Sequence, residues 1–262
     1  MIDIASNSFY VAPGFQPALR EIGLDAEAIF SHPDIHVWRK LPDRENCTLD
    51  ATLVDGQKIR WHIKRYAATR RKTSPTDDEV RGHRLLEREA IPTATLVGYG
   101  HISDGRSFVI FEDLAGYQAA DKLIERRTPF ERLLRPTADL AAQLHRAGLH
   151  HRDLYLCHFM AKVSGDEIDL KLIDAARVRR LPGMLTRRRW IIKDVAQFWY
   201  STLSLAITDE QRDAWLTRYA EQRGLVSAAT LQPAVRRKAR QIARHDAKLR
   251  RKQPRRNISI PR

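Results

Sequence analysis

The stretch His151-Arg152-Asp153-Leu154-Tyr155-Leu156-Cys157-His158 decides the interpretation of this 262-residue chain. Apolar residues at helical spacing precede it and stop at Gly148, a pattern typical of a helix that ends at a glycine. After it, alternating apolar residues over 168–174 predict a short strand that ends in Asp174. The sequence therefore predicts a helix, a loop that carries Asp153, and a strand that delivers a second carboxylate.

The composition is that of a folded protein without a disulfide framework. With 43% hydrophobic residues, the chain can bury a core in one bilobal domain or in two small domains. Its two cysteines, Cys47 and Cys157, are too few for a disulfide scaffold and indicate a reducing compartment. The first residues lack the basic and apolar regions of a secretory signal, and the most apolar window, 191–207, contains charged residues. We therefore expect a cytoplasmic protein.

The net charge of +14 is concentrated in two segments. Residues 233–262 contain twelve Lys and Arg but one acidic residue, and residues 177–193 contain seven Lys and Arg and no acidic residue. Segments of this kind attract anionic partners such as nucleic acid, acidic lipid or a phosphorylated glycan.

The order of predicted elements indicates two lobes. A helix is expected over 18–30, and the Asp55-Gly56 pair predicts a hairpin between strands 48–54 and 58–64. Ser74-Pro75 is typical of a helix start, and this helix is expected to run to about residue 90. Strands are then expected over 95–99 and 107–111, followed by mainly helical sequence.

This order predicts an α+β bilobal fold with a small antiparallel sheet and one helix in the first lobe. We expect the lobe boundary near residue 115, with an N-terminal lobe over 1–114. The helical C-terminal lobe with the catalytic loop then covers 115–252, and a basic tail covers 253–262.

The His-Arg-Asp triplet is typical of the catalytic loop of protein-kinase-like enzymes, where the Asp accepts the proton of the attacking hydroxyl. Asp153 is therefore predicted to be the catalytic base, and the alternative for it is a surface ion pair. Asp174 is predicted to hold Mg²⁺ between nucleotide phosphates, since Mg²⁺ prefers hard carboxylate oxygens. Its alternative role is that of a turn residue.

Lys64 ends the predicted strand 58–64, at the position where kinases keep the lysine that holds the nucleotide phosphates. The alternative is a solvated lysine at a strand end. Glu79, on the following helix, is predicted to pair with Lys64, although Thr76 and Glu79 also fit a capping box. His158 stands where protein kinases place an Asn that binds a second metal ion. It is a doubtful metal ligand that could instead contact phosphate or pack structurally.

The segments 151–158 and 172–178 (Leu-Ile-Asp-Ala-Ala-Arg-Val) together resemble the lipopolysaccharide core kinase (Kdo/WaaP) family. Further matches are residues 62–66, Glu79 with 91–93, and 192–194. The resemblance covers roughly residues 37–205 and implies a protein-kinase-like fold that phosphorylates a sugar of the inner core. Two departures are Ala175-Ala176 after the metal-site Asp and the lack of a glycine-rich loop before Lys64.

The resemblance also implies roles for individual residues. Asp153 would be the base in a loop with His151 and Arg152, and Asp194 would brace that loop from a helix. Lys64, positioned by Glu79, would anchor the phosphates of ATP, Asp174 would hold Mg²⁺, and backbone groups of Glu112 and Leu114 would hold the adenine.

The basic segment 177–193 follows the predicted metal site and suits an acceptor that already bears phosphates or carboxylates. The candidate acceptor-binding residues are Arg177, Arg179, Arg187 and Arg188. The predicted helix 235–249 has a narrow apolar stripe and a broad basic face, so it either packs on the body or lies on an anionic membrane. We favour peripheral contact with the inner face of the inner membrane over nucleic-acid binding.

The sequence therefore predicts an ATP- and Mg²⁺-dependent kinase for a hydroxyl of an inner-core sugar, heptose or Kdo, on a glycolipid. One alternative keeps the fold but acts on a protein or a small molecule. Another is a catalytically inactive scaffold, which the missing glycines and His158 would suit. A third is a nucleic-acid-binding module driven by the basic tail.

Overall fold

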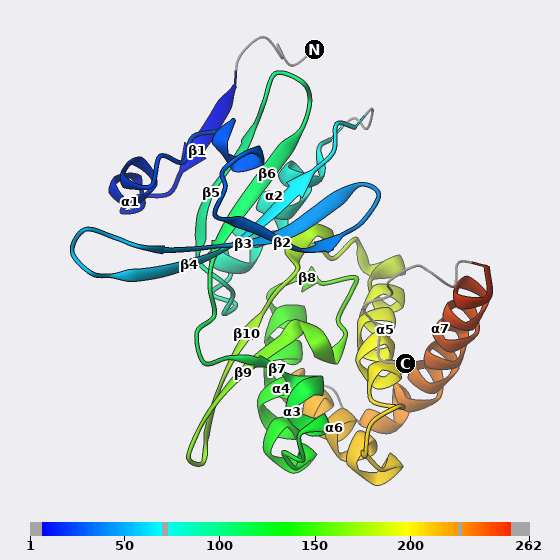
Figure 1. Ribbon diagram of the computed structural model, residues 1–262. Coiled ribbons are helices and arrows are strands. Elements are labelled where there is room, and N and C mark those ends of the chain that lie inside the picture. Colours follow the sequence, from blue (N-terminus) through cyan, green and yellow to red (C-terminus); the bar gives the residue numbers. More distant parts are fainter. Residues whose placement is uncertain (1–6, 70–72, 225–226, 253–262) are drawn as a thin grey trace. The chain divides into compact units, whose positions relative to one another are not determined.

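The computed structural model describes residues 7–69, 73–224 and 227–252, so the predicted tail 253–262 lies outside the described residues. The chain divides into two compact units, each described by itself (Figure 1). Unit 1 comprises Met1–His83 and Ala94–Ala115, and unit 2 comprises Arg84–Thr93 and Gly116–Arg262. The predicted mixture of helices and antiparallel strands is confirmed.

Unit 1 contains a six-stranded antiparallel sheet in the order β1-β5-β6-β4-β3-β2. Its strands are β1 (Ser8–Val11), β2 (Ile35–Lys40), β3 (Arg44–Thr52), β4 (Lys58–Tyr66), β5 (Leu96–His101) and β6 (Ser107–Glu112). The predicted hairpin joins β3 to β4, with Thr52 opposite Lys58. Gly56 adopts φ 84°, a conformation that glycine reaches without steric cost, and the Asp55 carboxylate accepts a hydrogen bond from Gln57 N at 2.8 Å.

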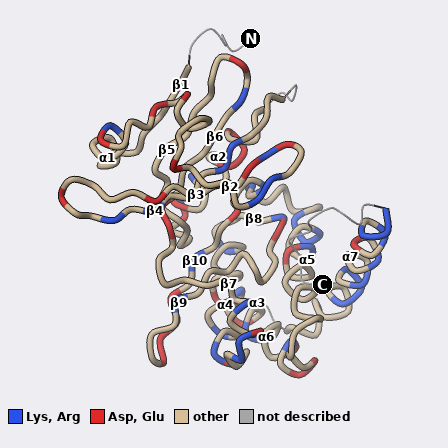
Figure 2. The backbone as a smooth tube through the Cα atoms, viewed as in Figure 1, with Lys and Arg blue, Asp and Glu red and all other residues tan. Residues whose placement is uncertain are grey.

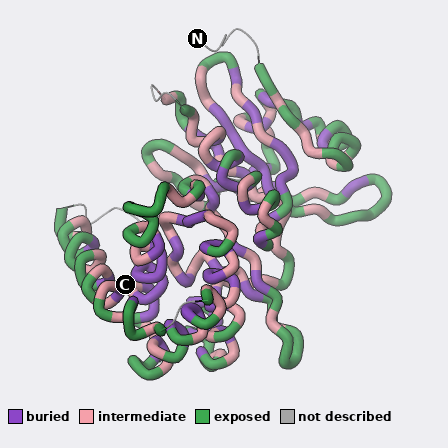
Figure 3. Tube along the Cα trace, turned by 180° about the vertical axis from the view of Figure 1, so that it is seen from behind, coloured by how far each residue is buried: buried purple, intermediate pink, exposed green. Residues whose placement is uncertain are grey.

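The central strand β6 is buried on both faces because its side chains alternate between two cores. Phe108 and Ile110 pack with residues of β3, β4 and the short helices of unit 1, whereas Val109 and Phe111 pack with Val80 of helix α2 (Pro75–Arg88). Figure 3 shows strands of unit 1 coloured as buried over much of their length. The Ser74 hydroxyl accepts a hydrogen bond from Asp77 N at 3.0 Å, so α2 begins where the sequence predicts.

Two features of unit 1 differ from the prediction. The expected single helix over 18–30 is wrong, because Gly23 at φ 67° separates helix α1 (Gln16–Glu21) from the 3-10 turn η1 (Ala28–Phe30). Strand β1 was not predicted. It pairs with β5 at a place where a Cβ on Gly100 would lie 2.3 Å from Ser8 O, so only glycine permits this pairing.

The described residues of unit 2 that follow Gly116 form five helices and short strands on either side of residues 151–158. The helices are α3 (Ala120–Glu125), α4 (Phe130–Arg146), α5 (Met184–Ser201), α6 (Asp209–Gln222) and α7 (Gln232–Lys252). One antiparallel sheet has the order β10-β9-β7, formed by β7 (Gln118–Ala119), β9 (Phe159–Ser164) and β10 (Glu167–Leu172). A second pairs β8 (Leu149–His150) with β11 (Arg179–Arg180), and the 3-10 turns are η2 (Leu156–His158), η3 (Ala175–Arg177) and η4 (Ala228–Thr230).

The core of unit 2 fixes α5 against the neighbouring helices. Phe198 of α5 stacks on Trp215 of α6 with ring centroids 4.0 Å apart, and Phe159 contacts Phe198 edge-on at 5.6 Å. Aromatic pairs of this kind contribute beyond the area that they bury. Helix α5 is therefore a rigid support at the centre of the unit.

Candidate active site

The predicted catalytic loop is held by a row of polar side chains on one face of α5. Asp194, Gln197 and Ser201 lie at the i, i+3 and i+7 positions of this helix, and all three are buried. Each accepts hydrogen bonds from backbone N–H groups of the loop. We call these three residues the α5 ladder.

Asp194 binds the first residues of the loop. Its two oxygens accept from His151 N at 2.6 Å and from Arg152 N at 2.8 Å, and the His145 ring lies 3.3 Å away. Burial alone would raise the pKa of the Asp194 carboxyl, but the hydrogen bond from His145 and the loop amides outweigh burial and hold the pKa below its usual value. Asp194 is therefore an ionised anchor for the loop.

Arg152 explains why the loop needs such an anchor. It has φ 70°, in the left-handed region that a residue with a side chain adopts at an energetic cost. Its carbonyl oxygen accepts from Lys193 Nζ and from Gln197 Nε2, both at 2.9 Å. Its guanidinium lies 4.8 Å from the centre of the Trp190 ring. The contacts on both sides of its peptide unit hold Arg152 in this conformation.

The lower part of the ladder holds residues 154–156. Gln197 Oε1 accepts from Leu154 N at 3.3 Å, and Ser201 Oγ accepts from Leu156 N at 2.9 Å. Ser201 Oγ donates in turn to Phe198 O at 2.7 Å.

Replacing Ser201 with alanine is expected to lower the free energy of unfolding by about 1–3 kcal/mol, because Leu156 N–H would stay buried without an acceptor. Urea unfolding followed by tryptophan fluorescence measures this change. Ser204→Ala, at an exposed position just after α5, is the matched control and is expected to change stability by less than about 0.5 kcal/mol. Equal stabilities of the two variants would contradict the role of Ser201.

The Asp153 carboxylate projects from this loop into a cationic environment. Arg177 Nη1 lies 2.9 and 3.0 Å from its two oxygens, and Gln197 Nε2 lies 3.4 Å from Oδ1. Lys193 also lies near, and burial, followed by the charge of Arg177, lowers the pKa of Lys193 below its ordinary value. An oriented carboxylate surrounded by cations can accept a proton from a hydroxyl and can attract an anionic reactant.

Asp174 follows β10 in the left-handed conformation, at φ 63° and ψ 59°. His158 Nε2 lies 3.6 Å from its carboxylate. The other ring nitrogen, Nδ1, lies 2.7 Å from Asp153 O and must donate, because a carbonyl oxygen only accepts. Burial opposes a charge on His158, but the hydrogen bond to Cys157 and the nearby charges, including Asp174, raise its pKa to about 10. His158 thus links the two carboxylate-bearing segments as a cation.

His151 is fully buried beneath the same loop. Its Nε2 lies 3.1 Å from Ile173 O and so must donate to it. Burial, the largest effect, lowers the pKa of the His151 imidazole, so the ring is neutral at pH 7. His151 connects the loop to the segment before Asp174 and does not reach solvent.

In unit 1, Lys64 and Glu79 form the predicted pair. Lys64 Nζ lies 2.9 and 3.0 Å from the two Glu79 oxygens, and Tyr66 Oη donates to Glu79 at 3.2 Å. The Glu79 side chain is 1% exposed and the Lys64 side chain 21% exposed. Since Ser74 caps α2, Glu79 does not serve as a capping-box residue.

The remaining predicted residues lie in two places. Glu112 ends β6 opposite Trp61, and its N–H donates to Thr95 O at 3.0 Å, whereas Leu114 packs against the core that contains Val109. Among the predicted acceptor-binding arginines, Arg177 reaches Asp153. Arg179 instead donates to Ala176 O and Val178 O within its own turn. Arg187 and Arg188 lie in the first turns of α5, where Arg188 reaches Thr230 O at 3.4 Å.

Within the ranges that the structure describes, no group of three or more His, Cys, Asp or Glu is placed to hold a metal ion by itself. Mg²⁺ in phosphoryl-transfer sites usually takes one or two carboxylates and completes its ligands with water and substrate phosphates.

The sequence did not predict a role in the site for His145, Lys193, Gln197 or Ser201. Helical spacing could have indicated Gln197 and Ser201. Positions 194, 197 and 201 are polar and lie on one face of the helix, whereas Val195, Ala196 and Phe198 between them are apolar. Buried polar residues need partners, and the loop amides supply them.

Part of this sequence is similar to known proteins. Residues 52–219 match the model of the lipopolysaccharide kinase (Kdo/WaaP) family. The lipopolysaccharide core heptose(I) kinase WaaP of Pseudomonas aeruginosa is 31% identical over 151 residues, which are 52% of this chain and 56% of that protein. The protein of the same name from Escherichia coli K12 is 25% identical over 226 residues, 74% of this chain and 80% of that protein.

A further Escherichia coli protein of that name is 37% identical over 90 residues, 32% of this chain and 31% of its own length. The similarity thus spans between about a third and four-fifths of these relatives. The family model covers well over half of the chain and includes the whole α5 ladder, Asp153, Asp174, Lys64 and Glu79, so the predicted resemblance is confirmed. The chain belongs to the lipopolysaccharide kinase (Kdo/WaaP) family.

Proposed function

We propose that the protein is an ATP-dependent kinase that phosphorylates a sugar hydroxyl of the lipopolysaccharide inner core. The names of the relatives favour a heptose as the acceptor. The observation that carries the proposal is the Asp153 carboxylate, held on a loop that the α5 ladder orders and flanked by Arg177. In this proposal, unit 1 is the N-terminal lobe of a protein-kinase-like fold and unit 2 is its C-terminal lobe, with a boundary near 115.

In this proposal Asp153 orients the acceptor hydroxyl and takes its proton as the hydroxyl oxygen attacks the γ-phosphorus of ATP. Arg177 leaves the Asp153 carboxylate for an anionic group of the acceptor, and Lys193 adds a second positive charge beside it. Lys64, positioned by Glu79, binds phosphate oxygens of the nucleotide, and backbone groups near Glu112 and Leu114 hold the base.

The residues present fit a magnesium ion through Asp174, whose carboxylate supplies the hard oxygen donors that Mg²⁺ prefers. When bound, Mg²⁺ neutralises negative charge on the phosphate oxygens. His158 fits this site less well as a ligand, since its Nδ1 donates to Asp153 O and Mg²⁺ prefers oxygen ligands to imidazole nitrogen. We assign His158 the role of holding Asp174 and the Asp153 backbone in place.

The substrate is proposed to be a phosphorylated or carboxylated glycolipid reached from the cytoplasmic face of a membrane. Within residues 7–69, 73–224 and 227–252, no helix has the length and apolar character needed to cross a bilayer. The proposal is tested by incubating the protein with ATP, Mg²⁺ and deacylated core oligosaccharide, and measuring the added phosphate by mass spectrometry. Transfer of phosphate to generic protein substrates instead would indicate a protein kinase. Absence of a thermal shift with ATP and Mg²⁺ would indicate a catalytically inactive scaffold.

Lys64→Met is expected to lower kcat/KM for ATP by about 10²-fold, because a charged donor to the phosphates is lost. Steady-state kinetics with varied ATP measures this change. Lys58→Met is the matched control, since Lys58 lies exposed at the other end of the same strand and should leave kcat/KM unchanged. Similar kinetics for both variants would remove Lys64 from the nucleotide site.

A further inference from the structure

The first turns of α5 project from unit 2 without a buried face. Residues 183–189 are all exposed, and the first buried residue of the helix is Ile191. Met184 is 91% exposed and Leu185 is 101% exposed. A surface helix of a globular protein normally turns an apolar stripe toward its core, so two fully exposed large apolar residues at a helix start call for a partner. We call residues 184–189 the α5 tip.

Positive charge surrounds this apolar pair. Arg187 and Arg188 lie three and four positions after Met184, and Arg188 and Arg189 have the same spacing from Leu185, so they are neighbours on the helix surface. The whole segment 177–193 contains no acidic residue. The α5 tip therefore combines two exposed apolar side chains with three arginines one turn further along the helix, of which Arg188 also reaches Thr230 O.

Helix α7 adds positive charge to unit 2, but its apolar side chains are not available to enter a membrane. Its apolar stripe is already used, because Val235 and Ala239 are buried in the core that contains Ile191 and Val195 of α5. Of the two arrangements expected for this helix, the structure shows packing on the body. Tyr200 of α5 also donates to Asp246 at 2.7 Å.

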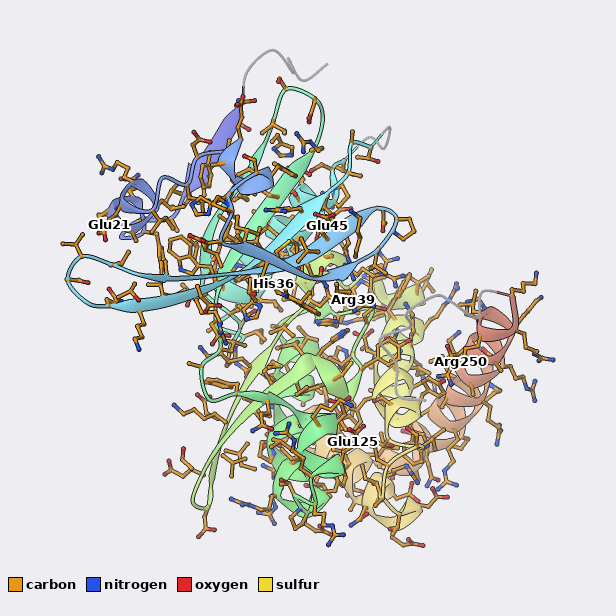
Figure 4. All side chains as sticks on the ribbon, viewed as in Figure 1. Glu21, His36, Arg39, Glu45, Glu125 and Arg250 are labelled. Atoms are coloured by element: carbon orange, nitrogen blue, oxygen red, sulfur yellow. The ribbon has the colours of Figure 1, made fainter. Side chains whose placement is uncertain are left out.

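The exposed residues of α7 are largely cationic and include Arg237, Arg240, Arg244 and Lys248, and Figure 2 shows Lys and Arg along this helix. Arg250, labelled near the end of α7 in Figure 4, pairs with Asp246 at 2.7 Å. This helix can therefore attract an anionic surface, but apolar side chains that enter such a surface must come from elsewhere in the unit.

We propose that the α5 tip docks on an anionic phospholipid bilayer. Met184 and Leu185 would enter the headgroup region, and Arg187, Arg188 and Arg189 would bind lipid phosphates. Nucleic acid would use the arginines but offers no apolar medium for the pair. A second copy of the chain would bring the same positive charge against itself. The bilayer matches both properties of the tip.

The test uses the full-length protein and flotation with two kinds of vesicle, without nucleotide. One vesicle is pure phosphatidylcholine, and the other contains equal parts of phosphatidylcholine and phosphatidylglycerol. The wild type is expected to float with the anionic vesicles only, and added salt should weaken this binding. Binding should fall about tenfold in the double variant Met184→Gln/Leu185→Gln, since the apolar contribution is lost. It should fall about fivefold for each arginine replaced by glutamine.

Val54→Gln is the matched control. Val54 is also 91% exposed, but its N–H bonds to Glu21 and no basic cluster follows it, so vesicle binding should stay at the wild-type level. Equal loss in both variants, or binding to neutral vesicles as strong as to anionic ones, would overturn the proposal. A dimer that disappears in the double variant, with no vesicle binding by the wild type, would assign the tip to self-association. Tighter binding to an oligonucleotide than to vesicles would assign it to nucleic acid.

This proposal does not require the kinase activity, because vesicle binding is measured without nucleotide. The two remain distinguishable in the double variant. Phosphorylation of deacylated oligosaccharide should be unchanged in it, whereas phosphorylation of the glycolipid embedded in anionic vesicles should fall with the lost binding.

Discussion

Asp153→Asn is expected to lower kcat by about 10²–10⁴-fold, the range typical of a lost general base. Asparagine keeps the size of the side chain and can still pair with Gln197, but it cannot accept the acceptor's proton and gives Arg177 no negative charge. The variant should fold normally, because the loop is held through Asp194, Gln197 and Ser201 and not through the Asp153 carboxylate.

Steady-state turnover of core oligosaccharide measures this loss, and calorimetry should show nearly unchanged ATP binding. Asp166→Asn, an exposed position in the turn between β9 and β10, is the matched control and should keep full turnover. Residual turnover of Asp153→Asn within tenfold of the wild type would exclude Asp153 as the base.

Asp194→Ala is expected to have the largest effect on stability, lowering the free energy of unfolding by about 3–5 kcal/mol. The substitution leaves His151 N–H and Arg152 N–H without their acceptor and removes the charge beside His145. Without its bond to Asp194, Arg152 can leave its left-handed conformation, and the relief of that strain, about 1–3 kcal/mol, offsets part of the loss. Turnover should fall together with stability, because the peptide that carries Asp153 is no longer oriented.

Asp139→Ala separates this effect from the simple loss of an ion pair. Asp139 forms a bidentate ion pair with Arg218 at 2.7 and 2.8 Å, but both side chains are partly exposed to solvent. Its removal should cost only about 0–1 kcal/mol. Urea unfolding of both variants makes the comparison, and similar losses would show that Asp194 is not a special anchor.

The elements predicted well are those whose signals are local. Asp55-Gly56 identified the β3–β4 hairpin, and Ser74-Pro75 identified the start of α2, because turn and cap residues act on their immediate neighbours. Strand β1 was not predicted, since its pairing with β5 depends on Gly100, more than ninety positions away. The expected helix over 18–30 failed because one glycine, Gly23, outweighed the helical pattern around it.

In the candidate site, too, features with local sequence signals were predicted and contacts between distant residues were not. The roles of Asp153 and Asp174, predicted from a motif and a strand end, stay predictions, whereas the Lys64–Glu79 contact predicted from element order is present in the structure. The partners of the catalytic loop could not, because Gln197 and Ser201 lie more than forty positions from the amides that they accept. The position of Arg177 on Asp153 was equally hidden, since the composition of segment 177–193 distinguishes none of its arginines.

The α5 ladder accepts from the peptide N–H groups of residues 151, 152, 154 and 156, so this part of the support does not depend on which side chains stand at those positions. Every amino acid except proline offers the same N–H, so proline is the one replacement that this support forbids at 151, 152, 154 and 156. Side chains at partly exposed positions of this loop, such as Cys157, can therefore change while the hydrogen bonds from α5 to the loop peptides stay the same.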